Sequence, residues 1–298
     1  MKAMSLCVIP WMILGLSLSA GEASAQQQKA KLGENAALRY WAAIGQMTDQ
    51  AIGDEEVKEL NEILKGKIAY DDLKFRDLVE KNRPALETMA RGTTLANCDW
   101  GLEYAQGLDV QFPYSAKAVA LARLNVLYAF HLQSMGDKEG SVRALVAGWR
   151  FSHDIANGAP MIIATLLAKV SLANHLVAIA SIVQTNGFSP QQRSILRKAL
   201  VQFGSDPLDW KSPMTREIEG FKMAEEIHSR PWPCSLPPAR FAQYWAGIVD
   251  DASTLPEFEK IVASQPKECR DFFPNAKRIL DARQELNGKL GETLFLLQ

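Results

Sequence analysis

Residues 114–157 read YSAKAVALARLNVLYAFHLQSMGDKEGSVRALVAGWRFSHDIAN, and they contain two helical patterns joined by one short turn. Over 114–135, apolar side chains recur on one helix face: Leu121, Leu124, Tyr128, Leu132 and Met135. Residues 138–157 carry a matching apolar face. Between them, Gly136 is suited to end the first helix and Asp137 to cap the second. The stretch therefore predicts an antiparallel helical hairpin.

The next stretch, residues 160–185, is apolar on all sides, which is typical of a helix enclosed by its neighbours. It resembles a transmembrane segment, but Lys169, Asn174 and His175 lie in its middle, where each would be costly in lipid. We therefore expect a buried core helix. The following helix is expected to start with a capping box, with Ser189 as its N-cap, Pro190 at its first position and Gln192 at its third.

Helical periodicity also dominates the rest of the chain, and strand patterns are nearly absent. Further helices are predicted over 34–52, 71–91, 213–228, 239–251, 256–264 and 274–296, and one more with Asp54 as its N-cap. Pro84 predicts a break or kink near Asn82 and Arg83. Thr254 and Glu257 predict a capping box. Residues 92–113, rich in glycine, are expected to form a long connection of a kind that is often functional.

These patterns predict an all-α fold, an irregular α-α superhelix or layered helical bundle of about ten helices. No fixed repeat length is present in the sequence. We expect residues 26–298 to form a single all-α domain. The proline-rich linker at 229–238 leaves a subdivision open at that point.

The first 25 residues have the features of a secretory signal peptide: Lys2, an apolar stretch from Leu6 to Leu18, and small residues at 23–25. We expect cleavage near Ala25. A retained membrane anchor is the alternative, but crossing the hydrocarbon core takes roughly 20 apolar residues and this run is shorter. The mature chain is therefore expected to be exported, to the periplasm or out of the cell, without a transmembrane segment.

Charge is balanced, with 33 Lys and Arg residues against 34 Asp and Glu residues. Because there is no basic excess, we expect no binding to nucleic acid or to an anionic membrane.

Cysteine usage is uneven. Cys7 would leave with the signal peptide, so Cys98, Cys234 and Cys269 remain, an odd number in a compartment that favours disulfides. Cys234 and Cys269 lie in proline-flanked, loop-like places and are the favoured pair. Three separate buried thiols are an equally good alternative, because free cysteine is among the most buried residue types.

Four places resemble an uncharacterised family of exported bacterial all-α proteins: Glu34 to Trp41, Cys98-Asp99-Trp100-Gly101 with Gly107 behind it, the turn at Gly136-Asp137, and the helix start at Gly187 to Pro190. Only the Cys-Asp-Trp-Gly loop is distinctive. Members of that family have no assigned activity, so the resemblance implies a fold class and export but no catalytic residues. The hairpin at Gly136-Asp137 is also similar to a tetratricopeptide unit, although the aromatic and small-residue pattern of that repeat is missing.

Three histidines, His131, His153 and His175, are 22 residues apart on three consecutive predicted helices. Pairing the helices across their turns leaves neighbouring imidazoles on the order of 16 Å apart, at about 1.5 Å per residue. Zinc needs its nitrogens about 2.1 Å from one point, so we expect no three-histidine site. His153 shares the apolar stripe of Trp149, which favours a hydrogen-bonded core histidine. We expect no metal and no cofactor.

Residues 213–228 carry the first catalytic candidates. On a helical projection Glu225 and His228 lie near the apolar face, with Glu217 on its flank. Glu225 and His228 have the spacing used in di-metal helical bundles, but the second Glu-x-x-His that such a site needs is missing. An acid/base pair is a further interpretation. The favoured alternative is a solvated last turn, since Glu and His pairs are common at helix ends.

The long connection carries the second set of candidates. Asp99, Trp100 and Tyr104 could line a pocket whose aromatic faces suit a sugar or a peptide. The favoured interpretation is structural, with Asp99 as a cap and Trp100 filling a gap between layers. A catalytic Cys98 would need an activating histidine within hydrogen-bond distance.

The sequence contains no phosphate-binding glycine loop, no Gly-x-Ser-x-Gly turn and no His-Glu-x-x-His motif. We therefore hypothesise a non-catalytic exported helical scaffold that binds a protein, peptide or glycan on a concave surface. The rival hypothesis is a periplasmic or extracellular hydrolase that uses Glu217, Glu225 and His228, or the Asp99 loop.

Overall fold

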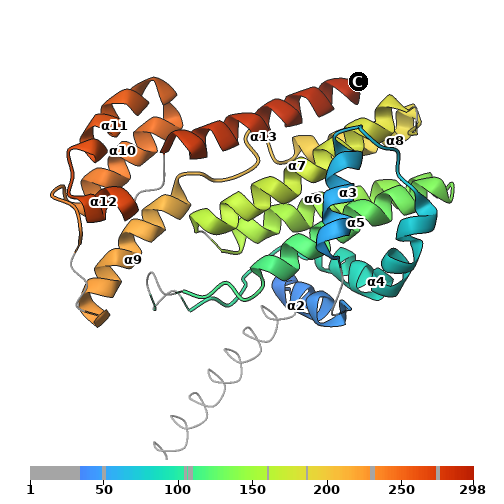
Figure 1. Cartoon of the computed structure of the whole chain (residues 1–298), viewed down its shortest axis with the longest axis horizontal. Helices are drawn as coiled ribbons and strands as arrows, with labels where there is room; N and C mark the ends of the chain where they lie inside the picture. Colours follow the sequence, from blue (N-terminus) through green and yellow to red (C-terminus); the bar gives the residue numbers. More distant parts are fainter. Residues whose placement is uncertain are drawn as a thin grey trace, which may run out of the picture.

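The computed structural model of the chain describes residues 34–48, 52–103, 106, 110–159, 161–185, 187–228, 232–272 and 276–298, without the side chains of 221–228 and 272. Within these residues the fold is all-α, as the sequence predicts, and the one extended pairing is an isolated bridge from Asn35 to Asn97. Long helices fill the centre of the molecule and shorter ones gather at one end (Figure 1). The expected signal peptide at 1–25, its cleavage position and Cys7 lie outside the described residues.

Three long helices form the centre (Figure 1): α5 Ser115–Ser134, α6 Lys138–Asn157 and α7 Ile162–Gln184. Helices α5 and α6 form the predicted hairpin. At the turn, Gly136 has a φ of +80°, a left-handed conformation that glycine adopts without strain. The Asp137 carboxylate then accepts a 2.8 Å hydrogen bond from the backbone N–H of Gly140, which caps α6. Asp137 is thus the predicted N-cap of α6, whereas the C-cap of α5 is Met135, one residue before Gly136.

Helix α7 packs against both helices of the hairpin. Three of its alanines, Ala164, Ala168 and Ala178, are fully buried, and such small side chains let neighbouring helices approach closely. Length and composition alone would allow α7 to cross a bilayer, but 61% of its most apolar window is buried inside the protein. The buried residues include His175 in the middle of the helix.

The N-terminal helices are α2 Ala36–Gln46, α3 Asp54–Leu64 and α4 Asp72–Gly92. Helix α4 is continuous through Pro84, so of the expected break or kink the break is wrong. Packing overrides the local cost of proline, because α4 is buried on both sides of that residue, against α2 and α5. The Asn82 side chain also accepts from the Thr48 N–H at 3.0 Å and donates to the Leu78 carbonyl at 2.9 Å.

The start of α3 lies one residue from its expected place. Gly53, and not Asp54, is the N-cap, and Asp54 is the first helical residue. The Glu56 carboxylate accepts a 3.0 Å hydrogen bond from the Gly53 N–H, which is the half of a capping box that does not need a side chain at the N-cap.

The C-terminal half contains α8 Pro190–Val201, α9 Ser212–His228, α10 Pro238–Asp250, a 3₁₀ turn at Ala252–Thr254, α11 Leu255–Ala263, α12 Lys267–Phe272 and α13 Ala276–Leu296. The capping box of Ser189 and Gln192 that starts α8 is confirmed. The capping box predicted for Thr254 is wrong. Because the 3₁₀ turn leads directly into α11, the Thr254 hydroxyl donates to the Asp251 carbonyl at 2.8 Å and makes no cap bond.

Helix α13 returns from the short helices at the end of the molecule to the centre, where it packs along α7 (Figure 1). It also contacts α8 and α11. The Thr293 hydroxyl of α13 lies 3.5 Å from the Leu176 carbonyl of α7. The last helix therefore connects the two parts of the fold.

Candidate functional site

The Cys-Asp-Trp-Gly loop is held to the core by Asp154 of α6, a residue that is 1% exposed. Its carboxylate accepts a 2.6 Å hydrogen bond from the Tyr40 hydroxyl of α2 and lies 3.1 Å from the Arg150 Nε. Its backbone carbonyl accepts from the Trp100 indole at 3.1 Å and from the Cys98 thiol at 3.5 Å. One buried aspartate thus positions both α2 and the loop.

Trp100 has no ring face left for a ligand. The ring stacks on Tyr114 at 4.0 Å between centroids and lies 5.7 Å from the Tyr40 ring, and the residue is 3% exposed. A Cβ on Gly158 would come within 2.5 Å of the same indole, so only glycine allows this close approach. The structure therefore gives Trp100 a packing role, the structural interpretation that the sequence favoured.

The rest of the loop offers little chemistry. Asp99 is exposed and its carboxylate accepts a 2.9 Å hydrogen bond from the Gly101 N–H. Burial, followed by the charge of Asp154, raises the pKa of the Cys98 thiol, which opposes formation of a nucleophilic thiolate. Tyr104 lies outside the described residues.

Glu217 caps another helix. Its carboxylate Oε1 accepts a 2.9 Å hydrogen bond from the backbone N–H of Ile162, the first residue of α7. Burial raises the pKa of this carboxyl to about 7. The side chains of Glu225 and His228 lie outside the described part of the chain. Glu217, the member of the catalytic set whose side chain is described, is thus already hydrogen-bonded to the N-terminus of α7.

The three evenly spaced histidines have three different environments. In His131 of α5, Nδ1 lies 2.7 Å from Asp72 and Nε2 lies 3.3 Å from Glu80, both on α4, so the imidazole connects these two helices. The His153 ring packs 4.3 Å from the Phe203 ring. Among the described residues, no three His, Cys, Asp or Glu side chains converge in a way that could hold a metal ion.

His175 is fully buried between the central helices. Its Nδ1 lies 2.8 Å from the Ser171 carbonyl and its Nε2 lies 2.9 Å from the Asn125 side chain. Burial lowers its pKa to about 4, so the ring is neutral near pH 7. A Cβ on Gly148 would lie 2.0 Å from Asn125 and 2.1 Å from His175, so a glycine on α6 makes room for this polar contact.

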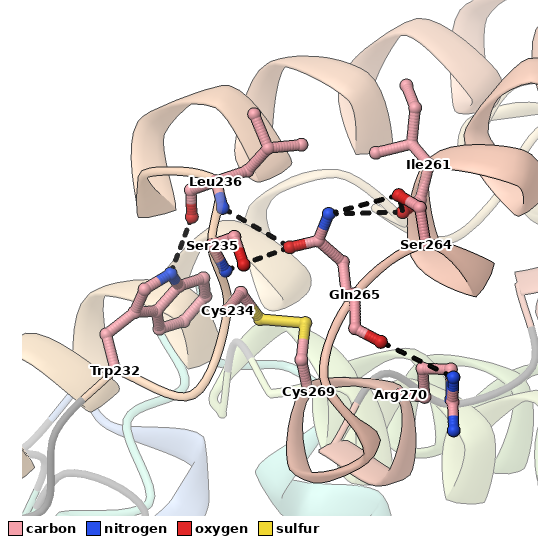
Figure 2. Close-up of a disulfide and its surroundings, with 9 residues drawn as sticks. All are labelled: Trp232, Cys234, Ser235, Leu236, Ile261, Ser264, Gln265, Cys269 and Arg270. Carbon is pink, nitrogen blue, oxygen red and sulfur yellow. Dashed lines mark hydrogen bonds between the residues drawn. A yellow bond between two sulfur atoms is a disulfide. The ribbon is translucent and has the colours of Figure 1, made fainter.

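Cys234 and Cys269 are joined in a disulfide that connects the linker before α10 to α12 (Figure 2). Beside it, the Gln265 side chain accepts from the backbone N–H groups of Ser235 at 2.9 Å and Leu236 at 3.3 Å (Figure 2). Cys98 is a free thiol. The disulfide and the glutamine side chain together fix the linker against the short helices.

Three neighbouring cavities of about 260, 400 and 470 Å³ lie along α7. The first two share Val177 and the first and third share Ser181, so the three form one groove, which we call the α7 groove. The floor consists of α7 residues: Val170, Ala173, Asn174, Val177, Ala180, Ser181 and Gln184. In the first two cavities one wall is the end of α3 with the turn after it and the other is α13, whereas in the third cavity α5 takes the place of α13.

Lysines line both walls of the α7 groove. Lys65 and Lys67 share Glu62, at 3.0 and 2.9 Å. Lys169 and Lys289 share Glu285, at 2.5 and 3.6 Å.

Each of these two carboxylates is held by two ammonium groups. Lys67 and then Lys65 lower the pKa of Glu62, and Lys169 lowers that of Glu285. Glu292 adds a further carboxylate to the lining. Even with Glu62 counted, the four lysines exceed the three glutamates, so the groove carries a net positive charge.

No known protein family, curated protein or solved structure matches this chain. The α7 groove is therefore the candidate functional site on its geometry and charge alone.

Sequence reasoning missed this groove because its walls come from residues more than 200 positions apart, Lys65 and Lys289. One signal was visible. Lys169 and Asn174 interrupt an otherwise apolar helix. Lys169 and Asn174 argue against a transmembrane segment. In the fold, they also mark the side of α7 that lines the groove.

Proposed function

We propose that the protein is an exported, non-catalytic helical scaffold that binds a polypeptide segment in the α7 groove. The groove carries this proposal, because it is long, concave and lined by aliphatic and cationic side chains from three separate helices. A glycan ligand has less support. The aromatic rings that line the groove, Tyr70 and Phe130, stack on each other at 5.5 Å at one end of it.

The described candidates for catalysis support the non-catalytic part of the proposal. Glu217 caps α7, and Trp100 is buried against the rings of Tyr114 and Tyr40. The one observation that favours the rival hydrolase is the pKa of about 7 for Glu217. Burial against a helix end accounts for that value without a catalytic role.

Export rests on the sequence of residues 1–25 and is supported by the disulfide between Cys234 and Cys269. Structural disulfides persist in oxidising compartments and are rare in the cytosol. We propose the periplasm or the cell exterior as the location, with no nucleic-acid partner.

A selection of random peptides displayed on phage, with the immobilised mature protein as bait, tests the proposed function. The comparison bait is Val177→Trp, because Val177 lines two of the three cavities and a larger side chain there would fill the groove. Ile195→Trp is the matched control, at an exposed position on α8 away from the groove (48% exposed). Circular dichroism would verify that all three proteins fold.

We expect peptides that are enriched on the wild-type protein and on Ile195→Trp and are lost on Val177→Trp. Equal enrichment on all three baits, or none on any of them, would refute a peptide-binding groove.

A further inference from the structure

Helix α7 carries a stripe with the spacing of a coiled-coil seam, and the part of it from Val170 onward lines the groove. Its positions alternate by four and three residues: Ile163, Leu167, Val170, Asn174, Val177, Ser181 and Gln184. Each of these residues is at least partly exposed, Ile163 by 45% and Val170 by 41%. A seam of this period is the pattern with which one helix accepts a second helix.

The stripe is apolar except at its centre and its C-terminal end. Ile163, Leu167, Val170 and Val177 are aliphatic, and Asn174 lies between them. Exposed aliphatic side chains in a row along one helix are unusual for a surface that faces only water. A single buried asparagine in such a seam is a known means of fixing the register of two paired helices.

Charge indicates the nature of the second helix. Lys65 and Lys289 stand on opposite walls and line the same two cavities. Among the described residues, each pairs with a carboxylate that it shares with another lysine. A ligand that brings its own carboxylates to both edges would complete these ion pairs. The same lysines would repel a ligand with basic edges.

Resting on the proposed function, we propose that the α7 groove binds an amphipathic helix of a partner protein, with an aliphatic seam flanked by Asp or Glu on both sides. The stripe from Ile163 to Gln184 corresponds to about six helical turns, or roughly 32 Å. The partner segment therefore needs about 20 residues. This is helix-in-groove recognition, in which the apolar seam supplies affinity and the flanking charges supply selectivity.

Two other occupants are less suited to this surface. In a second copy of the chain, the groove-lining lysines of one protomer would approach those of the other. A lipid surface is flat, whereas the stripe from Val170 onward lies between two walls that carry charged side chains. Both occupants are outcomes of the test below.

Two designed peptides test the proposal by fluorescence anisotropy on the mature protein. Each peptide has about 21 residues and the same Leu and Asn seam, and one has Glu and the other Lys at all flanking positions. We expect the Glu peptide to bind with a Kd on the order of 10 µM and the Lys peptide at least about tenfold more weakly. Added salt should reduce this difference.

Variants place the binding in the groove. Val170→Glu should weaken the Glu peptide about tenfold or more, because it puts a charge into the seam, whereas Ile195→Glu, at a similarly exposed aliphatic on α8, should change nothing. The double variant Lys65→Glu and Lys289→Glu should reverse the preference and favour the Lys peptide. Lys267→Glu, at an exposed lysine outside the groove, is the matched charge control.

Several results would overturn the inference. Equal binding of both peptides would refute the role of the lysines, and binding that Val170→Glu leaves unchanged would refute the seam. Concentration-dependent self-association or vesicle binding that Val170→Glu abolishes would assign the stripe to a second copy or to a membrane. A further outcome separates this inference from the proposed function. If neither designed peptide binds, but the phage selection yields peptides that are not acidic amphipathic helices and that Val177→Trp abolishes, this inference fails and the proposed function stands.

Discussion

The centre of the molecule and its α10–α12 end are stabilised in different ways. Helices α4 to α7 have 20 to 23 residues each and bury long faces against one another. Helices α10 to α12 have 13, 9 and 6 residues and follow a proline-rich linker. The centre contains buried polar contacts such as His175 with Asn125, whereas the end contains the disulfide.

The difference shows what helix length provides. A helix of about 20 residues presents enough apolar surface to be held by packing, whereas isolated helices shorter than about 12 to 15 residues are marginal in water. At the α10–α12 end, the disulfide and the Gln265 side chain supply the restraint that short helices lack. We therefore expect the two regions to respond differently to changes in packing, redox state and pH.

The largest effect is expected from Gly148→Ala in the centre. The added Cβ would lie 2.0 Å from Asn125 and 2.1 Å from His175, in a region with no room to relax. We expect a loss of about 4 kcal/mol in the free energy of unfolding, measured by urea denaturation. Gly45→Ala, where a Cβ meets nothing within 4 Å, is the control and should change stability by less than about 1 kcal/mol. A similar result for the two variants would show that the centre is not tightly packed.

Removal of the disulfide is expected to affect the other region. It closes a loop of 35 residues, which corresponds to a loss of about 3 to 4 kcal/mol in the chain-entropy account. In the double variant Cys234→Ser and Cys269→Ser, hydrogen exchange should accelerate in α10–α12 and stay slow in α5–α7. This pattern would also support a subdivision of the chain near 229–238. Equally faster hydrogen exchange in α5–α7 and α10–α12 would contradict a difference between the two regions and would favour one cooperative unit.

Acid should weaken the centre through His175. Its folded pKa of about 4 lies below the ordinary value of 6.5, so the unfolded chain binds a proton more readily between these values. Stability is therefore lost as the pH falls through that window, by about 2 kcal/mol between pH 7 and pH 5. Calorimetry on the wild type and on His175→Gln checks this. At pH 7 the variant should be less stable than the wild type, and its free energy of unfolding should decrease less as the pH falls to 5. An unchanged pH dependence would contradict the prediction.

The smallest effect is expected from Glu217→Gln, with the opposite pH dependence. The folded pKa of Glu217, about 7, lies above the ordinary value of 4.5, so stability is lost as the pH rises through that window. The amide keeps an oxygen for the Ile162 N–H and cannot ionise. The difference between the two pKa values corresponds to about 3 kcal/mol at pH 8. The second N–H of the amide, which the carboxyl lacks, offsets roughly 2 kcal/mol of this in a buried site. We therefore expect the variant to exceed the wild type by about 1 kcal/mol at pH 8 and to be the less stable protein at pH 5. A variant that is less stable at pH 8 as well would indicate that the charge is needed.

The sequence predicted most of the local structure because local signals dominate there. The bounds of α6, the turn at Gly136 and the Ser189 capping box agree with the structure. The errors arose where distant or adjacent structure overrides the local signal. Packing on α2 and α5 keeps α4 continuous through Pro84, and the 3₁₀ turn occupies the Thr254 hydroxyl.

The candidate site could not be predicted from local patterns. The groove exists because α3 and α13 stand on either side of α7, and that arrangement depends on the whole fold. The sequence suggests Trp100 as a binding residue and Glu217 as a catalytic one, but both have structural roles. Trp100 packs on Tyr114, and Glu217 caps the N-terminus of α7. The seam on α7 was present in the sequence, but the residues of that helix are apolar on every side, which concealed it.

The bond between Tyr40 and Asp154 has a consequence for the order of events during biosynthesis. The two partners are separated by 114 residues, so the hydroxyl of the first described helix has no acceptor until α6 has been made. At ribosomal speeds of about 5 to 20 residues per second, this delay is on the order of 10 seconds. A chain that emerges N-terminus first can pack α2 against α4 early, but the Tyr40 hydroxyl must wait that long for its buried acceptor.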